Sequence, residues 1–341
     1  MKFSIVIPVR NGKKYIARAI DSVLIQSYTN YELIAVDNNS TDGTLDILKE
    51  YKDIKLLTFN EPDKKISFAV AEGCKVATGD YILFLDSDDY FEIDALEKLA
   101  KLIKDEDIIC YSYNYVVDDS KRPIAIPKKE YVGTDAIHEL LSKLYFDEHS
   151  FGTFKYLPIF RWVKACKLEK VQEFLDKYSS MNLDKYEDLV FTFEMVARSN
   201  VIRTYNIPLV NYFQVPLSNS KLIDNNAPYE ELLNLRKTIK GYLFDFADRY
   251  NLNKEVFATV DFEISNNYLS KYIMSHGYKD SKRLFKKIQK DEDYKLQKNL
   301  CRAKKDSYKK KCYFICTKLN FFYPIYKRFK DKNKWWTQLW E

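Results

Sequence analysis

The segment Asp-Tyr-Ile-Leu-Phe-Leu-Asp-Ser-Asp-Asp at residues 80–89 decides the fold of this chain. Its apolar half is typical of a strand that is buried on both faces, as in a parallel sheet. The run ends in three carboxylates, Asp86, Asp88 and Asp89. Acids at the carboxyl end of a buried strand repel one another unless a cation or solvent separates them, and this end is where open α/β sheets bind ligands. The stretch predicts either a divalent-metal site or a solvated turn that caps a helix starting near Ile93.

Strand and helix patterns alternate on both sides of this segment. We expect strands at Phe3–Val9, Tyr31–Val36, Ile54–Phe59 and Tyr81–Leu85, and helices at Lys13–Gln26, Thr44–Tyr51 and Ser67–Ala77. This alternation requires a parallel sheet with right-handed crossovers, so the predicted fold class is α/β. The first strand is not followed by Gly-x-Gly-x-x-Gly, so the usual dinucleotide fingerprint is missing.

The chain after residue 90 is less regular. The patterns predict helices at Ala95–Lys104 and Leu189–Arg198, strands at Asp107–Val117, Val201–Tyr205 and Leu209–Phe213, and helices from Tyr229 to about Lys290. Between the first of these strands and the second helix lie aromatic patches, among them Phe160-Arg161-Trp162. The sequence leaves open whether these patches are core or a binding surface.

Charge is distributed unevenly along the chain. The net charge is +6, but residues 301–341 hold 12 basic and 3 acidic residues, so the first 300 residues are net negative. This basic tail is also rich in Trp, Tyr and Phe, which favours binding to the headgroup region of an anionic membrane; the alternative is a helical extension packed on the body. An acidic body without a nucleic-acid module argues against a nucleic-acid partner. Six scattered cysteines and no signal-peptide pattern favour a reducing cytoplasm.

Six short motifs follow one another along the chain. They are Ile-Val-Ile-Pro-Val-Arg-Asn (5–11), Val-Asp-Asn-Asn-Ser-Thr-Asp-Gly-Thr (36–44), Asn-Glu-Pro-Asp-Lys (60–64), Ala-Thr-Gly-Asp-Tyr-Ile (77–82), Phe-Leu-Asp-Ser-Asp-Asp (84–89) and Tyr-Glu-Asp (186–188). In order and spacing they resemble family 2 glycosyltransferases, closely over 3–90, more loosely to about 220, and not in the tail. The resemblance implies the GT-A fold, a mostly parallel sheet flanked by helices, with a C-terminal helical extension here.

The resemblance also implies which residues hold the nucleotide-sugar donor: Pro8, Arg10, Asp37, Asn38 and Asp86. Arg10 stands where relatives often carry an aromatic residue, and its guanidinium can stack on a base. Asp37 can accept a hydrogen bond from a ribose hydroxyl or a base N–H. Many relatives have Asp where this chain has Asn38, which can still bond a uracil edge. The Ala-Arg-Asn-x-Gly motif of relatives is missing, so Lys64, Lys65 or Arg10 is expected to supply its positive charge.

Two further roles follow from the resemblance. Asp86 and Asp88 look like the metal-binding Asp-x-Asp motif, with Asp88 on Mn²⁺ or Mg²⁺ and Asp86 near the ribose or a metal-bound water. Asp89 is a weaker candidate, as a ligand or a helix cap. Asp188 matches the general base that an inverting transferase needs opposite the leaving group, and Glu187 is the alternative. Both acids could instead be ordinary helix-start residues favoured by the dipole.

The sequence therefore predicts an inverting, metal-dependent glycosyltransferase that uses a nucleotide-sugar donor, with UDP expected. Its acceptor is expected to be a glycan or lipid-linked glycan of a bacterial surface polysaccharide, at the cytoplasmic face of the inner membrane. We expect a catalytic domain at 1–220, a helical extension at 221–300 and a basic-aromatic tail at 301–341. The alternatives are a non-catalytic nucleotide-sugar-binding or scaffold protein, a basic-tail nucleic-acid binder and a sugar nucleotidyltransferase, which would release pyrophosphate.

Overall fold

The computed structural model describes residues 1–118, 120–143, 157–214 and 229–254, together with residues 257, 283, 286 and 290. The chain forms two compact units, Met1–Pro216 and Leu217–Glu341. The domain boundaries predicted at 220 and 300 stay predictions. The basic-aromatic tail at 301–341 lies outside the described residues.

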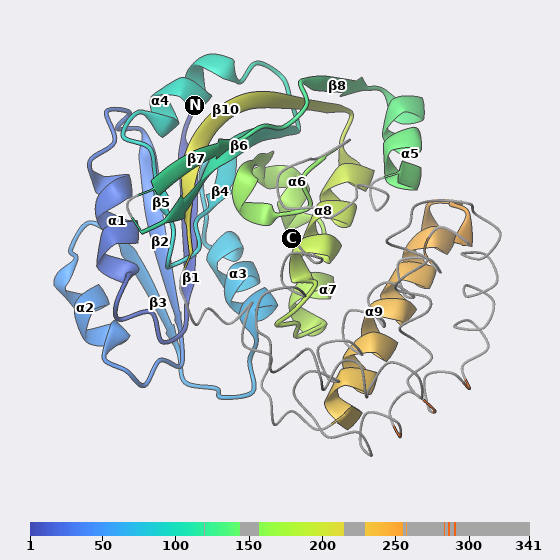
Figure 1. Ribbon diagram of the computed structural model, residues 1–341, viewed down its shortest axis with the longest axis horizontal. Coiled ribbons are helices and arrows are strands. Elements are labelled where there is room, and N and C mark those ends of the chain that lie inside the picture. The colour runs from blue at the N-terminus through green and yellow to red at the C-terminus, as the bar shows by residue number, and fades with distance from the viewer. Residues whose placement is uncertain are drawn as a thin grey trace, which may run out of the picture. The chain divides into compact units, whose positions relative to one another are not determined.

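The first unit is built on one sheet whose first half is parallel. Its order is β3-β2-β1-β4, formed by β1 (Phe3–Val9), β2 (Tyr31–Asn38), β3 (Lys55–Phe59) and β4 (Tyr81–Phe84). The crossovers are α1 (Ile16–Leu24), α2 (Thr44–Glu50) and α3 (Ile66–Lys75). Figure 1 shows α1 and α2 on one side of these strands and α3 on the other. The predicted alternation of strands and helices is confirmed here.

The second half of the sheet is mixed. It continues as β9-β6-β10-β5, formed by β5 (Tyr90–Phe91), β6 (Ile108–Val117), β9 (Lys164–Lys167) and β10 (Val201–Phe213). β9 is antiparallel to both β4 and β6, so β4 and β6 run in the same direction. β7 (Ser120–Ile124) pairs with β6, and β8 (Lys129–Val132) pairs with β10. Antiparallel insertion at β9 was not expected from the sequence.

Strand β10 corrects one prediction. The sequence pattern predicted two strands on either side of Asn206, but β10 is continuous, with register shifts against β6 on both sides of Pro208. Proline cannot donate a backbone hydrogen bond to a ladder, so it is tolerated at an irregularity of this kind. The apparent break in the pattern is a bulge within one strand.

Several helices complete the first unit. They are α4 (Ala95–Leu102), α5 (Thr134–Lys143), the 3₁₀ turn η2 (Arg161–Val163), α6 (Leu168–Gln172), α7 (Leu175–Ser180) and α8 (Glu187–Arg198). The sequence analysis predicted α4 and α8 but neither α5 nor the short α6 and α7. α6 and α7, with five and six residues, carry too few turns for a periodic apolar pattern, which explains why these two were missed. α5 has ten residues, of which Ile137, Leu140 and Leu141 are buried at helical spacing.

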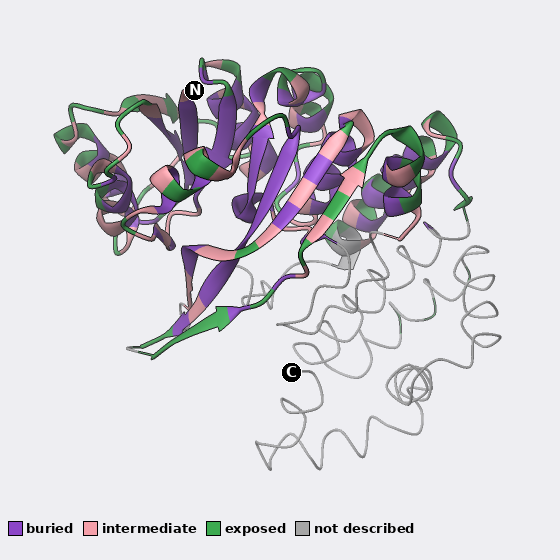
Figure 2. Cartoon of the chain, turned by 90° about the horizontal axis from the view of Figure 1, so that it is seen from above, coloured by how far each residue is buried: buried purple, intermediate pink, exposed green. Residues whose placement is uncertain are grey.

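Alternation along β1 divides the core between two faces. Ile5 and Ile7 belong to an apolar cluster with the buried side chains of α1, while Val6 points to α3. Gly73 makes that second contact possible, because a Cβ there would lie 2.6 Å from Cγ1 of Val6. Figure 2 shows the central strands as almost wholly buried. β1 is buried on both faces, as the apolar run predicted.

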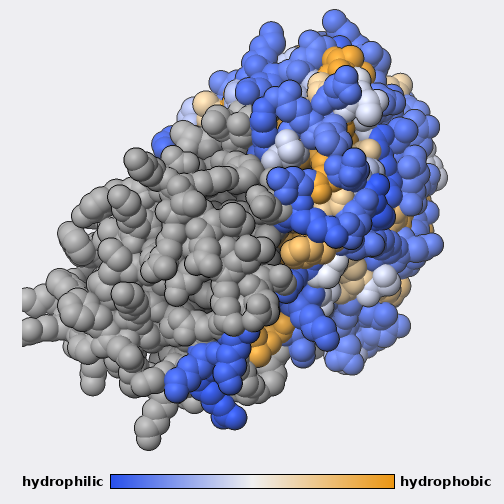
Figure 3. Space-filling view, turned by 90° about the vertical axis from the view of Figure 1, so that its right-hand side faces the viewer, coloured by the Kyte–Doolittle hydropathy of each residue, from blue (hydrophilic) through white to orange (hydrophobic). Residues whose placement is uncertain are grey.

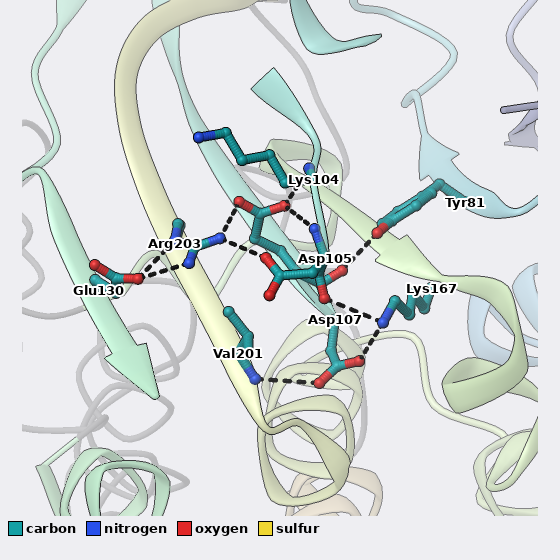
Figure 4. Close-up of polar contacts among 9 residues, drawn as sticks. Tyr81, Lys104, Asp105, Asp107, Glu130, Lys167, Val201 and Arg203 are labelled. Carbon is teal, nitrogen blue, oxygen red and sulfur yellow. Dashed lines mark hydrogen bonds and ion pairs between the residues drawn. The ribbon is translucent and has the colours of Figure 1, made fainter. Parts of the chain in front are cut away.

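The amino-terminal edge of the sheet holds a cluster of acids, Asp105, Glu106 and Asp107, which we call the amino-edge cluster (Figure 4). Both oxygens of Asp107 are used, since Oδ2 accepts the N–H groups of Asn200 (2.6 Å) and Val201 (3.1 Å) and Oδ1 lies 3.0 Å from the Lys167 ammonium. This cluster joins the starts of β6 and β10 to the end of β9.

The remaining acids of the amino-edge cluster are equally well paired. Glu106 is fully buried and accepts backbone N–H groups of Lys104 (2.7 Å) and Asp105 (3.1 Å) on Oε2. Its Oε1 accepts from the guanidinium of Arg203, which also pairs with Asp105 at 2.8 Å. The hydroxyl of Tyr81 donates to the Glu106 carbonyl at 2.6 Å, tying β4 to the same corner.

In the second unit the structure describes α9 (Tyr229–Arg249). Ile239, Leu243 and Phe246 are buried along it, at the helical spacing that the sequence predicted. None of the described helices combines the length and the apolarity needed to cross a lipid bilayer. Figure 3 views the molecule from the right-hand side of Figure 1. Most of the described atoms on this face are hydrophilic, with hydrophobic side chains scattered among them.

Candidate active site

Parallel pairing brings the predicted donor residues to one edge of the sheet. Pro8 pairs with Val36 and Val9 with Asp37, so the ends of β1 and β2 are level. Val6 pairs with Phe84, which places the acidic loop after β4 beside the end of β1. The loops after three strands thus meet at the carboxyl edge of the sheet, where open α/β sheets bind ligands.

Two buried acceptors lie at the end of β2. Asp37 and Asn38 are 2% and 4% exposed. Asp37 accepts the Ser40 N–H at 3.3 Å through Oδ2, and the Asn38 amide donates to the Lys64 carbonyl at 3.0 Å. Within the described part of the chain, Oδ1 of Asp37 and Oδ1 of Asn38 have no hydrogen-bond partner. Unpaired buried acceptors are costly, so they mark where a ligand's donors can bind.

The segment Asn60–Lys65 borders these acceptors. The guanidinium of Arg10 donates to the Pro62 carbonyl at 3.4 Å, and the ammonium of Lys64 lies 4.7 Å from the centre of the Phe68 ring. Lys65 is paired with Asp184 at 3.3 Å. Arg10 and Lys64 therefore lie close to the ends of β1 and β2, while the charge of Lys65 is already offset by Asp184.

The same segment is tied to the chain that leads into α8. Asn182 donates to the Asp63 carbonyl at 2.9 Å and accepts the Lys65 N–H at 2.8 Å. Asn182 adopts a left-handed backbone conformation, with φ of 48°, that Asn tolerates better than most residues. These contacts position the segment Asn60–Lys65 relative to the residues that precede Glu187 and Asp188.

The acidic loop after β4 does not cap a helix. α4 begins only at Ala95, and Asp89 precedes the short strand β5 instead. Asp89 is fully buried, and its Oδ1 accepts the N–H of Phe213 at 2.8 Å, which holds the end of β10 against the loop. Burial, together with the charges of Asp88 and Asp86, raises the pKa of Asp89. The prediction that Asp89 caps a helix is therefore wrong.

Arg18, which the sequence analysis did not select, supports this loop from α1. Its guanidinium donates to the Asp88 carbonyl at 2.5 Å and lies 4.6 Å from the Tyr90 ring and 4.1 Å from the Phe213 ring. A cation between two aromatic faces is stabilised by their quadrupoles. Arg18 thus fixes the backbone that carries Asp88. A basic residue on the amphipathic first helix offered no signal that could have distinguished it.

Arg161 is the second residue that sequence analysis missed, and it joins the two halves of the site. Its side chain is 1% exposed. Nη2 lies 3.3 Å from Oδ1 of Asp86, while Nη1 lies 2.9 Å from Oε1 of Glu187 and 3.2 Å from Oδ1 of Asp188. The only signal in the sequence was a lone arginine inside an aromatic patch. Its neighbour Trp162 is 4% exposed, so at that position the patch is core.

The Tyr-Glu-Asp motif at 186–188 lies at the start of α8. Tyr186 has φ of 61°, a left-handed conformation that is strained for an aromatic residue, and the helix begins at the next residue. Oδ1 of Asp188 accepts the backbone N–H of Arg161 at 3.1 Å in addition to the guanidinium contact. The Asp188 side chain is 25% exposed, against 9% for Glu187. This difference favours Asp188 over Glu187 as the group that meets a substrate.

We call Asp86, Asp88, Asp89, Glu187 and Asp188 the carboxyl-edge cluster. Burial raises the pKa of Asp86 to about 7 and that of Glu187 to about 8, although Arg161 lowers both. Burial also raises the pKa of Asp88. These acids are more numerous than the two arginines that face them, so a bound cation would stabilise their charged forms.

Asp86 and Asp88 fit a divalent ion that is shared with a diphosphate. No group of three or more His, Cys, Asp or Glu side chains with the arrangement of a metal site occurs among the residues that the structure describes. Mg²⁺ in nucleotide sites needs only one or two carboxylates, because phosphates and waters complete its shell. The acceptor-only chemistry of these two partly buried carboxylates suits such an ion.

Comparison with known proteins agrees with the resemblance of the motifs. Residues 4–161 match the sequence model of a protein family described as Glycosyl transferase family 2. Over these residues the chain is similar to that family, in agreement with the motifs. The matched range contains the whole parallel half of the sheet, the acidic loop after β4 and Arg161, whereas Glu187 and Asp188 lie beyond it.

Two of the curated relatives are named for work on polymers of the bacterial surface: poly(ribitol-phosphate) in one name and teichuronic acid in the other. The chain is 40% identical over 102 residues to the poly(ribitol-phosphate) beta-glucosyltransferase of Bacillus spizizenii, covering 28% of this chain and 16% of that one. It is 40% identical over 98 residues to the putative teichuronic acid biosynthesis glycosyltransferase TuaG of Bacillus subtilis, covering 28% and 39%. The chain thus spans well under half the length of these two relatives.

The fold is GT-A. The crystal structure of S. aureus TarS 1-349 in complex with UDP-GlcNAc superposes with a TM-score of 0.54 at 18% identity, covering 89% of this chain and 93% of that one. At this identity the likeness shows the fold and no more.

Proposed function

We propose that the protein is an inverting, metal-dependent glycosyltransferase that moves a sugar from a UDP-linked donor to a glycan or lipid-linked glycan acceptor. One observation carries the proposal. Asp188, a partly exposed carboxylate, is joined through Arg161 to Asp86 at the same edge as the unpaired acceptors of Asp37 and Asn38. The residues proposed as base, diphosphate site and nucleoside site therefore lie at one edge of the sheet.

The donor half of the proposal rests on hydrogen-bonding capacity. The two free acceptors at the end of β2 require donors, which a ribose hydroxyl and a uracil N–H supply. Arg10 is exposed beside them and can stack on a base. The TarS structure that shares the fold contains UDP-GlcNAc, which supports a UDP-sugar here.

In the reaction, Asp188 accepts the proton of the acceptor hydroxyl as its oxygen attacks the anomeric carbon from the face opposite the diphosphate. Arg18 keeps the Asp88 backbone in place, and Asp86 remains oriented by Arg161. A divalent ion held by Asp88 and Asp86 would neutralise the charge that develops on the departing nucleoside diphosphate. Inversion follows because attack and departure occur on opposite faces of the sugar.

The biological setting is proposed from the relatives and the tail. The names of the Bacillus relatives support a role in building a cell-surface polysaccharide. The basic and aromatic residues at 301–341 support binding to the cytoplasmic face of an anionic membrane. The relatives' names thus support the proposed acceptor, and the composition of the tail supports the proposed localisation.

Turnover and binding of a panel of nucleotide sugars test the proposal. The panel is incubated with Mn²⁺, Mg²⁺ or EDTA, and we expect metal-dependent release of UDP from one donor. Asp88→Asn is expected to lose this activity by about 100-fold or more, since it removes a direct metal ligand. Asp94→Asn is the matched control, because Asp94 is a partly exposed acid of the same region, at the N-cap of α4, and among the described residues it pairs only with Lys98.

The result that contradicts the proposal is equally plain. If no nucleotide sugar is turned over and none binds in calorimetry with either metal, the protein is not a transferase and the scaffold interpretation gains. Release of pyrophosphate in place of UDP would identify a nucleotidyltransferase.

A further inference from the structure

Arg161 belongs to none of the six sequence motifs, yet it lies between two of them. It is separated by 75 residues from Asp86 and by 27 residues from Asp188. Antiparallel β9 brings it there, because this strand runs back beside β4 and starts at the carboxyl edge. The guanidinium also lies 5.2 Å from the centre of the Phe84 ring, the last residue of β4.

We propose that Arg161 is the residue that positions the general base, holding Asp188 through Oδ1 so that Oδ2 faces the acceptor. The inference rests on the proposed function and adds a residue to it. Oδ1 receives two hydrogen bonds from Arg161, one from the backbone N–H and one from the guanidinium. In the described part of the chain no hydrogen bond is found at Oδ2, and the side chain is partly exposed.

The same guanidinium sets the distance between base and donor. Its other terminal nitrogen binds Asp86, so one rigid planar group contacts both the base and the acidic loop. Attack on the anomeric carbon requires the acceptor oxygen and the leaving group to be aligned within a fraction of an ångström. A group that spans the two sides can hold that alignment before the substrates arrive.

Arg161 can act in this way because its own segment is held from several directions. The buried ammonium of Lys164 donates to the carbonyl of Pro158 at 2.6 Å and to that of Phe160. The hydroxyl of Thr192, on α8, donates to the Ile159 carbonyl at 2.7 Å. The residues before Arg161 are therefore bonded both to β9 and to the helix that carries Asp188.

Glu187 completes the arrangement without competing for the acceptor. Its Oε1 is the nearest carboxylate oxygen to the guanidinium, at 2.9 Å, and the residue is buried. This contact orients the guanidinium plane, and it leaves the more exposed Asp188 as the group open to substrate. The order of the pair, Glu then Asp, thus has a geometric reason.

The test measures donor hydrolysis, with water as the acceptor, on the full-length chain. Arg161→Lys keeps the charge but loses the planar fork, and we expect kcat to fall about 100-fold while the donor KM changes less than threefold. UDP binding with Mn²⁺, measured by calorimetry, is expected to be retained. Arg161→Gln is the harsher companion variant, expected to lose more kcat and some thermal stability.

Arg198→Gln is the matched control. Arg198 also pairs with a buried carboxylate, that of Glu194, and lies 5.2 Å from an aromatic ring centre, that of Phe174, but at the far end of α8. We expect this variant to lower the melting temperature while leaving kcat within twofold of the wild type. The control therefore distinguishes the effect of losing a buried ion pair from the effect of losing the group that positions Asp188.

A double variant decides whether Arg161 acts through Asp188. If it does, Asp188→Asn combined with Arg161→Lys is no slower than Asp188→Asn alone. Additive losses, or an unchanged kcat in Arg161→Lys, would overturn the inference while the proposed function stands. The proposed function is tested by the wild type alone. If the wild type neither turns over nor binds any nucleotide sugar, the proposed function is overturned, whatever the variants do.

Discussion

The carboxyl-edge and amino-edge clusters are two groups of acids at opposite edges of one sheet, and they differ in how they are paired. At the amino edge, both oxygens of Glu106 and of Asp107 accept from backbone N–H groups or cations. At the carboxyl edge, Oδ2 of Asp89 and Oε2 of Glu187 are buried without a partner among the described residues. The carboxyl-edge cluster has five acids and the amino-edge cluster three, and the larger cluster is the less completely paired.

The pKa shifts of the two clusters follow from this difference. Burial alone would raise the pKa of Asp107 and Glu106, but their hydrogen bonds and cations outweigh it and lower both values. Burial prevails over Arg161 at Asp86 and Glu187, and the pKa values rise to about 7 and 8. Fully satisfied acids stabilise a fold, whereas strained and incompletely paired acids are characteristic of functional sites.

The largest expected effect is on catalysis at the carboxyl edge. Asp188→Asn keeps the size and the Oδ1 acceptor but removes the proposed base, so we expect kcat to fall by about 1,000-fold, within the range for general-base loss. Steady-state kinetics on the identified donor measure this, with urea unfolding as the check on folding. If Asp188→Asn kept the wild-type kcat but unfolded at a much lower urea concentration, Asp188 would have a structural role, and the proposed difference between the two clusters would be wrong.

The reverse outcome is expected at the amino edge. Asp107→Asn leaves the Lys167 ammonium without its carboxylate and puts an amide among three donors, so unfolding free energy should fall by about 2 kcal/mol. Because the site lies at the other edge of the sheet, kcat at a temperature where the variant is folded should stay within twofold of wild type. Urea unfolding and kinetics on the same preparation measure both, and a loss of kcat without a loss of stability would contradict the assignment.

The smallest effect is the pH dependence of stability. The folded-state pKa values of Glu106 and Asp107 lie below their ordinary values of 4.5 and 3.8. Their contribution is therefore fully present above about pH 5 and is lost as pH falls through the folded-state values. We expect unfolding free energy to drop between pH 5 and pH 3, and Asp107→Asn to show a shallower drop. An identical slope in that variant would show that Asp107 does not contribute.

Sequence reasoning predicted most of the parallel half of the fold and every residue of the carboxyl-edge cluster. It succeeded because β1, β2 and β4 are short apolar runs that end in polar loops, and parallel strands bring such ends together. The second half was harder. Strand β9 is four residues long and pairs with strands distant in sequence, so no local pattern announces it.

By itself, the sequence determined the fold class, the edge at which the site forms and the acids that line it, because apolar periodicity and short motifs are local. Only the tertiary structure decided which of those acids are satisfied and what connects them. Arg161 meets Asp86 and Asp188 through the placement of an antiparallel strand, and Asp89 turns from a predicted helix cap into the anchor of β10. Such contacts depend on long-range pairing, and their energy is expressed only when the chain is folded.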